Sequence, residues 1–292
     1  MQTLKQLKNE FQKITPKFGN EILKLISSKT DDGKIFPPYV PFVGKKYDNY
    51  KIMVYATAQN IGFNGFRDFY TNNFDKLTER LFYSANDFNI KYPNNKISYK
   101  EIAINPYKTG VIPSLIGVFL YANFGIKISK LDEINDLIGI TNYYKFSLNS
   151  GNSDINPEGK VFKQLIRDNS QKNYYWKFND NLVKKEIETL KPKFIIAFSG
   201  RKIYQLQKNI DNNTHIIEVN DPACIFRYSC AGKASKNGIW IQKAEKCKGS
   251  EINDLIDNYL NSIVGNFKGH KKYIRLYLLN YYYDWKNSNI NN

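Results

Sequence analysis

The chain has 292 residues, 42% of them hydrophobic, which is enough for one large domain, or one domain with a substantial insertion, to bury a core. Its 43 Lys and Arg residues against 27 Asp and Glu give a net charge of +16, which favours a polyanionic partner such as nucleic acid, although an AT-rich genome produces the same Lys excess. Membrane and disulfide-stabilised secreted proteins are excluded, because no apolar run reaches ~18 residues, the N-terminal pattern is an amphipathic helix, and the cysteines are irregularly spaced.

The first element is an N-terminal helical extension over residues 1–40. Its apolar residues recur at helical spacing and predict one or two helices, after which a proline-rich loop leads into the core. Lys51–Ala58 is a short apolar run typical of a buried strand. Residues 63–135 form an insertion after this strand, in which we expect helices over 75–85 and 113–124.

Three further apolar runs predict three further strands. A helix is expected before the third strand, over 180–190 with Asp180 as its N-cap, and another begins after that strand at Ser199. The end of the chain, 285–292, is expected to be frayed. Short apolar strands that alternate with helices are typical of a parallel sheet covered on both faces, so the pattern predicts an α/β fold. The predicted strands are Lys51–Ala58, Leu137–Tyr143, Phe194–Phe198 and His215–Val219.

Four motifs accompany these strands in a fixed order. They are ATAQN (56–60), ITNYYK (140–145), LVKKEIETLKPKFIIAFSGRKIYQL (182–206) and EVNDPACIFR (218–227). In type and order they resemble the motifs of the uracil-DNA glycosylase superfamily, over about residues 40–62 and 130–230. The resemblance implies a single glycosylase-like domain over 1–292, with three α/β/α layers built on a central four-stranded parallel sheet. A generic doubly wound domain is the alternative explanation of the same pattern.

The chain departs from these family motifs at several positions. Ala56 and Gln59 stand where the first motif usually has Gly and Pro. Ala58 stands where many members have an Asp or Asn that activates water, although some branches also have Ala. Asp221 replaces the usual His of the last motif. Some branches bind an iron–sulfur cluster through four cysteines, whereas Cys224, Cys230 and Cys247 stand elsewhere, so we expect no cluster and no other cofactor.

A glycosylase must take the base out of the stack, read its edge, stabilise it as it leaves and place water. Asn142 is the candidate for reading the base, because a carboxamide presents a donor and an acceptor side by side; its alternative role is to cap a strand end. Phe63 or Phe66 is the candidate for stacking on the flipped base, with core packing as the alternative. Ala58 would then line the base pocket.

Asp221 is the most informative of the catalytic candidates. An ionised carboxylate repels the charge that develops on a departing base. Asp221 would therefore act in its protonated form, accept the amino group of a cytosine-type base, or position water, unless it only forms an Asp-Pro turn. Gln59 and Asn60 are candidates for orienting water or contacting the nucleotide, because a carboxamide is no general base. Asp68 is a spare candidate base or a surface charge.

Basic residues beyond the strand ends are candidates for phosphate contacts. The segment 227–236 is basic and rich in small residues, which suits a backbone-tracking loop and a solvated loop equally. His215 is expected to be structural and His270, in a Lys-rich stretch, to contact phosphate. The candidate DNA-binding residues are Lys145, Arg201, Arg227, Lys233 and Lys236.

These observations favour a DNA glycosylase that excises a modified, phage-type pyrimidine rather than plain uracil. The chain looks compatible with the superfamily's anti-phage members that act on modified cytosine, and the insertion over 63–135 would widen or cover the pocket for a bulky base. Two alternatives stay open: a DNA-binding relative without the chemistry, and a different α/β enzyme acting on a nucleotide. We expect a cytoplasmic monomer whose partner is DNA, with no membrane segment and no metal.

Overall fold

The computed structural model describes ten stretches of the chain: residues 6–7, 41–58, 110–144, 169–198, 210, 213–220, 222, 224–225, 238–263 and 265–288. Contacts between residues divide the chain into two compact units, where the sequence predicts one domain. We call them the sheet unit, formed by Met1–Val43, Tyr47–Ala103 and Gly139–Val219, and the helical unit, formed by Gly44–Lys46, Ile104–Ile138 and Asn220–Asn292. Each unit is described by itself.

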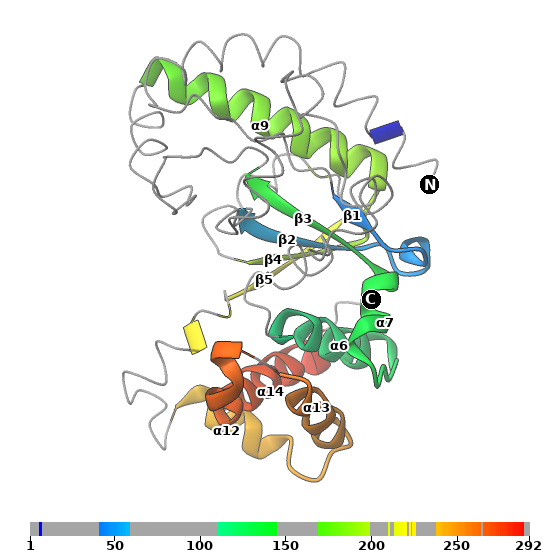
Figure 1. Cartoon of the computed structure of the whole chain (residues 1–292), viewed down its shortest axis with the longest axis vertical. Coiled ribbons are helices and arrows are strands. Elements are labelled where there is room, and N and C mark those ends of the chain that lie inside the picture. The colour runs from blue at the N-terminus through cyan, green and yellow to red at the C-terminus, as the bar shows by residue number, and fades with distance from the viewer. Residues whose placement is uncertain are drawn as a thin grey trace. The chain divides into compact units, whose positions relative to one another are not determined.

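The sheet unit contains a four-stranded parallel sheet with a short antiparallel strand at one edge (Figure 1). All four predicted strands are confirmed to within one residue, and the order across the sheet is β1-β3-β2-β4-β5. The short β1 pairs with β3 and was not predicted. The strands are β1 (Phe42–Val43), β2 (Ile52–Ala58), β3 (Ile138–Tyr144), β4 (Phe194–Phe198) and β5 (His215–Val219), with the 3-10 turn η1 (Tyr47–Asn49) before β2.

Burial explains why these runs form strands. All five residues of β4 are buried, as expected for a strand covered on both faces. In β5, by contrast, exposed residues such as Glu218 alternate with the buried Ile217 and Val219, which suits its place at the edge of the sheet. The N-terminal Leu7, in helical conformation, is also fully buried in this unit. The predicted α/β class is therefore confirmed.

Helix α9 (Asn169–Leu190) covers one face of the sheet (Figure 1). The prediction of a helix over 180–190 capped by Asp180 is wrong at its start, because the helix begins eleven residues earlier. Asp180 lies inside the helix, where its carboxylate accepts a hydrogen bond from the Tyr143 hydroxyl at 3.1 Å. An Asp before an apolar periodic run signals a cap in sequence, but here its partner comes from a distant strand.

In the helical unit, α6, α12, α13 and η3 pack against α14, and α7 packs against α6 (Figure 1). The predicted helix over 113–124 is confirmed and begins slightly earlier, and the first ten residues of this helix are all buried. Its Gly117 allows close approach of Tyr259, since a Cβ there would overlap the phenol ring. The elements are α6 (Val111–Phe124), α7 (Leu131–Leu137), α12 (Ile239–Lys246), α13 (Ile252–Asn261), η3 (Gly265–His270) and α14 (Lys271–Asn287).

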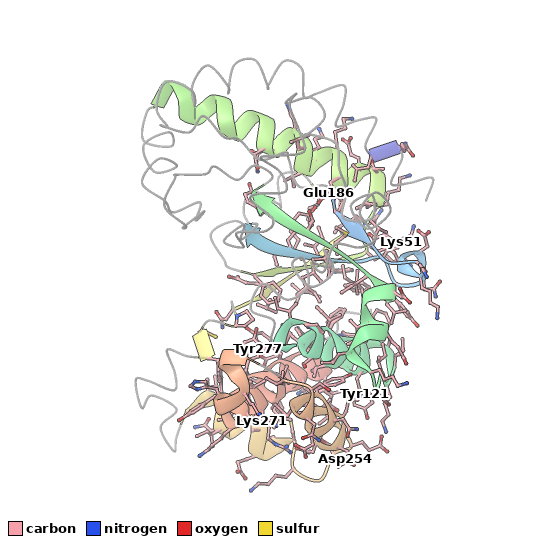
Figure 2. All side chains as sticks on the ribbon, viewed as in Figure 1. Lys51, Tyr121, Glu186, Asp254, Lys271 and Tyr277 are labelled. Atoms are coloured by element: carbon pink, nitrogen blue, oxygen red, sulfur yellow. The ribbon has the colours of Figure 1, made fainter. Side chains whose placement is uncertain are left out.

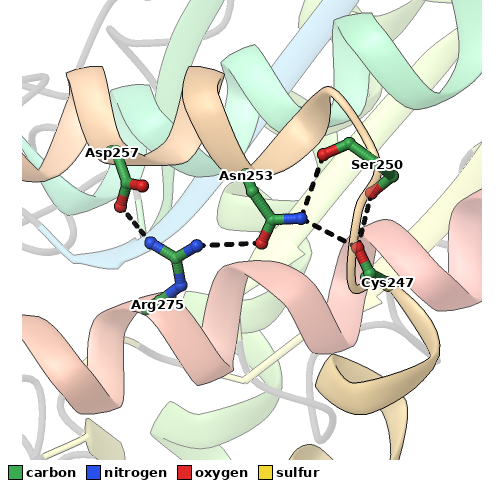
Figure 3. A network of polar contacts seen from close by, with 5 residues as sticks. All are labelled: Cys247, Ser250, Asn253, Asp257 and Arg275. Atoms are coloured by element: carbon green, nitrogen blue, oxygen red, sulfur yellow. Dashed lines mark hydrogen bonds and ion pairs between the residues drawn. The ribbon is translucent and has the colours of Figure 1, made fainter.

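Helix α14 continues into the segment over 285–292 that was expected to be frayed. Trp285 is only 5% exposed, and its indole packs edge-on against Phe119 with ring centroids 5.2 Å apart, so α14 continues to Asn287. A polar network also holds α14 against α13 and against the turn that contains Cys247 and Ser250, just before α13 (Figure 3). Arg275 donates to Asn253 Oδ1 at 2.8 Å and pairs with Asp257, while Asn253 Nδ2 donates to the Cys247 carbonyl at 2.8 Å.

Several sequence predictions fall outside the described residues. They include most of the extension over 1–40, the helix over 75–85 with residues 59–109 around it, and the helix that begins at Ser199. In the described parts of the chain, every helix is too short or too polar to cross a bilayer.

Candidate active site at the carboxyl edge of the sheet

The strand order creates a topological switch point between β2 and β4. Counted along the chain, the four parallel strands lie in the order second, first, third, fourth. Along the chain, β2 is followed by β3, which lies on one side of it, and β4 is followed by β5, which lies on the other side. Doubly wound α/β proteins bind their ligands outside the carboxyl ends of the strands at such a point.

The carboxyl ends of these strands lie close together. Tyr55 pairs with Ala197, and Phe198 pairs with Val219, so β4 and β5 end level with each other while β2 continues to Ala58. Neighbouring strands lie about 4.8 Å apart, which puts the chains of β2 and β5 about 10 Å apart.

Two of the predicted site residues lie in strands that end at this edge, and others follow such strands along the chain. Ala58 is the last residue of β2, and Asn142 lies in the carboxyl half of β3. Arg201 follows β4 by three residues and Asp221 follows β5 by two. The remaining candidates, and the side chains of Ala58 and Asn142, lie outside the described residues. Those candidates are Gln59, Asn60, Phe63, Phe66, Asp68, Lys145, Arg201, Asp221, Arg227, Lys233 and Lys236.

A buried carboxyl group ties together the two strands that carry the first two motifs. Glu186 of α9 is fully buried and accepts hydrogen bonds from the Tyr55 hydroxyl of β2 at 2.7 Å and from the Thr141 hydroxyl of β3 at 3.2 Å. Burial, and then the neighbouring Glu186, raise the pKa of Tyr55 well above its usual value, so Tyr55 stays a proton donor. Figure 2 labels Glu186 on the helix that covers the sheet.

Glu186 supports the site and does not line it. Tyr55 stands three residues before the end of β2, which is about 10 Å at ~3.3 Å per residue. The motifs do not point to Glu186, but the helix pattern around it carries a signal for this role. Glu186 stands among Leu182, Val183 and Ile187, which are all buried, so it interrupts an apolar helix face. Charged residues at such positions are rare unless they are paired.

Both neighbours of Asn142 are held in place by side-chain bonds. Thr141 donates to Glu186, and the carbonyl of Tyr143 accepts a hydrogen bond from Asn179 Nδ2 at 3.1 Å, while the Tyr143 hydroxyl is bonded to Asp180. Thr141 and Tyr143 are at most 1% exposed. The backbone that carries Asn142 is therefore fixed from both sides, as a base-reading residue requires.

Asp221 is also flanked by anchored residues. Both peptide groups of Asn220 are hydrogen-bonded to tyrosines of α14. On the other side Pro222 is buried, its carbonyl accepts from the Ile225 amide at 2.9 Å, and Ile225 is fully buried. These bonds lie within the helical unit and fix the chain just before and just after Asp221.

The two histidines take different surroundings. His215 begins β5 and stacks on Phe194 with ring centroids 5.7 Å apart, which agrees with the structural role expected for it. His270 ends η3 beside the exposed Lys268 and Lys272 of the helical unit. Among the side chains that the structure describes, no three His, Cys, Asp or Glu residues gather as a metal site would require.

Comparison with known proteins adds no relative. No protein-family model, no curated protein and no solved structure matches the chain.

Proposed function

We propose that the protein is a DNA glycosylase that flips out a modified pyrimidine and excises it by hydrolysis of the N-glycosidic bond. In this proposal the sheet belongs to a three-layer fold like that of uracil-DNA glycosylases. The observation that carries the proposal is the alignment of motifs with strands. Each of the four motifs accompanies one of the four parallel strands, and the carboxyl ends of these strands share one edge around a switch point.

In this proposal, residues at different strand ends have different roles in excision. Asn142 reads the edge of the flipped base, since its backbone is fixed by bonds at both neighbours. Asp221, after β5, either accepts the exocyclic amino group of a cytosine-type base or orients water at C1′. Gln59 and Asn60, after β2, hold that water. Excision then forms a bond from the water oxygen to C1′ and breaks the bond from C1′ to the base nitrogen, and the proton that the water loses ends on the released base.

The altered motifs explain why we propose a modified base. Asp221 stands where the family has a His that stabilises an anionic base oxygen, and a carboxylate repels such a charge. A base with an exocyclic amino group instead presents a donor that a carboxylate accepts. The net charge of +16 supports a partner with a phosphate backbone.

The same departures favour one rival, a DNA-binding relative that has lost the chemistry. Ala58 lacks the carboxylate or carboxamide that many members use on water, and Asp221 lacks an imidazole. The rival predicts tight, salt-sensitive binding of DNA with no cleavage. An enzyme that acts on a free nucleotide would show neither salt-sensitive binding of long DNA nor excision of a base from it.

The test is to incubate the purified protein with phage genomic DNAs that carry different base modifications, beside unmodified and uracil-containing DNA. Abasic sites are then counted by alkaline cleavage. We expect cleavage of one modified DNA only, which is lost in Asp221→Ala and in Asn142→Ala. Cleavage of no DNA, together with salt-sensitive binding, would replace the proposal with the DNA-binding relative.

A further inference from the structure

Three lysines of the sheet unit gather at the edge opposite the candidate active site, where the strands begin. Lys51 immediately precedes β2, Lys193 immediately precedes β4, and Lys191 immediately follows α9. The first residues of β2 and β4 pair with each other, and just before them the Lys193 amide donates to the Lys51 carbonyl at 2.9 Å. We call Lys51, Lys191 and Lys193 the lysine edge, and Figure 2 labels Lys51.

One buried tyrosine joins the two turns that carry these lysines. The Tyr47 carbonyl accepts a hydrogen bond from the Lys51 amide at 2.8 Å. The Tyr47 hydroxyl donates to the carbonyl of Leu190, the residue before Lys191, at 3.3 Å. Tyr47 is only 3% exposed, so this link is part of the core. The fold thus brings together lysines that lie far apart in the chain.

Lys51 and Lys191 have a left-handed backbone, with φ of 52° and 47°. Each ends a helical turn, since Lys51 closes on Tyr47 and the Lys191 amide donates to the Ile187 carbonyl at 2.8 Å. A left-handed residue often ends a helix, but Gly is preferred there and Asn is tolerated, because the Cβ of other residues opposes this conformation. The turns therefore explain the backbone and do not explain the choice of lysine.

Codon usage does not explain lysine at these two positions either. The codons of Asn are as rich in A and T as those of Lys, and the chain uses Asn freely. An AT-rich genome would therefore supply Asn, which fits a left-handed turn with less strain. Lysine differs from Asn by its long stem and its positive charge, and neither is needed to form the turn.

The three amines have no acidic partner among the residues that the structure describes. Lys191 and Lys193 are exposed, and Lys51 is partly exposed. A lysine elsewhere in this unit is placed differently, since Lys185 of α9 pairs with Glu188 at 2.9 Å. Like charges on adjacent segments of chain repel each other, so the lysine edge lowers the stability of the fold unless an anion binds there.

An open row of amines suits a partner whose negative charge is spread along a chain. A small molecule is usually held in a concave pocket, whereas the lysine edge is exposed. An apolar partner is not favoured, because the large hydrophobic side chain that is exposed in the described residues, Ile239, belongs to the helical unit. A phosphate backbone fits, since lysine binds phosphate as a point charge and the net charge of +16 favours such a partner.

We infer that the lysine edge is a second phosphate-binding surface, which holds the backbone of nucleic acid at the amino ends of β2 and β4. It lies a strand length away from the candidate active site, about 20 Å for the seven residues of β2. Nucleic acid bound at the lysine edge therefore leaves the carboxyl edge of the sheet free. The inference does not rest on base excision, because phosphate contacts position a nucleic acid without reading its bases.

The test variant is the double substitution Lys51→Asn, Lys191→Asn, because Asn keeps the left-handed turns and removes both amines. The control is Lys184→Gln, Lys185→Gln on α9 of the same unit. It removes the same number of charges, from lysines whose amines lie 3.9 Å and 2.9 Å from the Glu188 carboxylate. Binding of the full-length proteins to unmodified duplex DNA is measured over a series of salt concentrations.

Two readouts should move in opposite directions in the test variant. The slope of log affinity against log salt should fall by about 2, which is about 1 for each lost phosphate contact, and should change little in the control. The Tm should rise by about 2–4 °C, because strain at two left-handed residues is relieved. A purely structural role for the two lysines predicts the rise in Tm without the change in slope.

Several outcomes would overturn the inference. They are an unchanged slope in the test variant, an equal fall in the control, and no salt-dependent binding of DNA by the wild-type protein. Inorganic phosphate at equal ionic strength should compete with DNA no better than chloride does. Stronger competition that the test variant lacks would instead assign the lysine edge to a small anion. Excision is not measured, so failure of the glycosylase proposal would leave these results unaffected.

Discussion

Removal of the Tyr55 hydroxyl should destabilise the sheet unit more than an ordinary tyrosine-to-phenylalanine change. The Glu186 carboxyl is fully buried and accepts the Tyr55 hydroxyl at 2.7 Å. Hydrogen bonds to a buried charged or acidic group contribute about 1.5–3 kcal/mol, against about 1 kcal/mol for a neutral pair. We therefore expect Tyr55→Phe to lower the free energy of unfolding by about 2 kcal/mol.

The chain offers a matched control in Tyr47→Phe. Tyr47 is also buried in the sheet unit, but its hydroxyl donates to the neutral carbonyl of Leu190 at 3.3 Å. That change should cost about 1 kcal/mol or less, because the bond is long and its acceptor uncharged. Thr141→Val, which removes the second donor to Glu186 at 3.2 Å, should fall between the two.

Urea unfolding followed by circular dichroism measures these differences. With a dependence on urea of about 2 kcal/mol per molar, the Tyr55→Phe midpoint should fall by about 1 M. Both hydroxyls share one acceptor, so their effects should not be additive. The loss of unfolding free energy in the double variant Tyr55→Phe, Thr141→Val should therefore differ from the sum of the losses in the two single variants. Equal midpoint shifts in Tyr55→Phe and Tyr47→Phe, or strict additivity of the pair, would refute the role given to Glu186.

The helical unit yields three more predictions. Burial raises the pKa of the Tyr281 hydroxyl from 10.0 to about 12. The contribution of this group to stability is therefore complete below pH 10 and is lost as the pH rises towards 12, a loss of about 3 kcal/mol. Unfolding measured over a series of alkaline pH values should show this loss in the wild-type protein and not in Tyr281→Phe. Gly117→Ala puts a methyl group into the Tyr259 ring and should cost about 1–3 kcal/mol, seen as a lower Tm; an unchanged Tm would contradict the packing. The Lys-rich stretch around His270 is expected to contact phosphate, so Lys268→Ala, which removes an exposed amine from it, should reduce the salt slope of DNA binding by about 1. Lys127→Ala, whose amine is paired with Glu251, should leave that slope unchanged.

The strands were predictable because their signal is local. Runs such as Phe194–Phe198 are apolar throughout and too short for a helix, so they identify buried parallel strands without any tertiary information. Their order in the sheet does not follow from such local runs, and it is this order that brings β2 beside β4 and forms the switch point.

The helices were harder to predict because their signals are mixed. The start of α9, NSQKNYYWKFN, has no clear apolar face, and Asp180 imitates a cap while it bonds a strand residue. Helix α14 mixes Tyr, Lys and Asn around its circumference, and its two buried tyrosines, Tyr277 and Tyr281, bond to the distant Asn220. Such partners are set by packing, which sequence periodicity does not encode.

For the candidate site, the sequence predicted only which residues stand at or after the ends of strands. The sequence indicates that Asn142 and Asp221 stand at or beyond strand ends, and the strands do end at one edge. It did not indicate which groups bond the neighbouring residues Thr141 and Asn220. Glu186 and Tyr281 act through bonds that span 45 and 61 residues of chain, so no local pattern points from the site to its supports.

The most direct test of the central claim is to look for the products of hydrolysis in water enriched in ¹⁸O. Modified phage DNA is incubated with the protein, and the released small molecules and the DNA sugar are analysed by mass spectrometry. The glycosylase account predicts a free modified base and one ¹⁸O atom at C1′ of the abasic sugar, both lost in Asp221→Ala. Intact modified DNA that is bound tightly in low salt, with no base released, would contradict it.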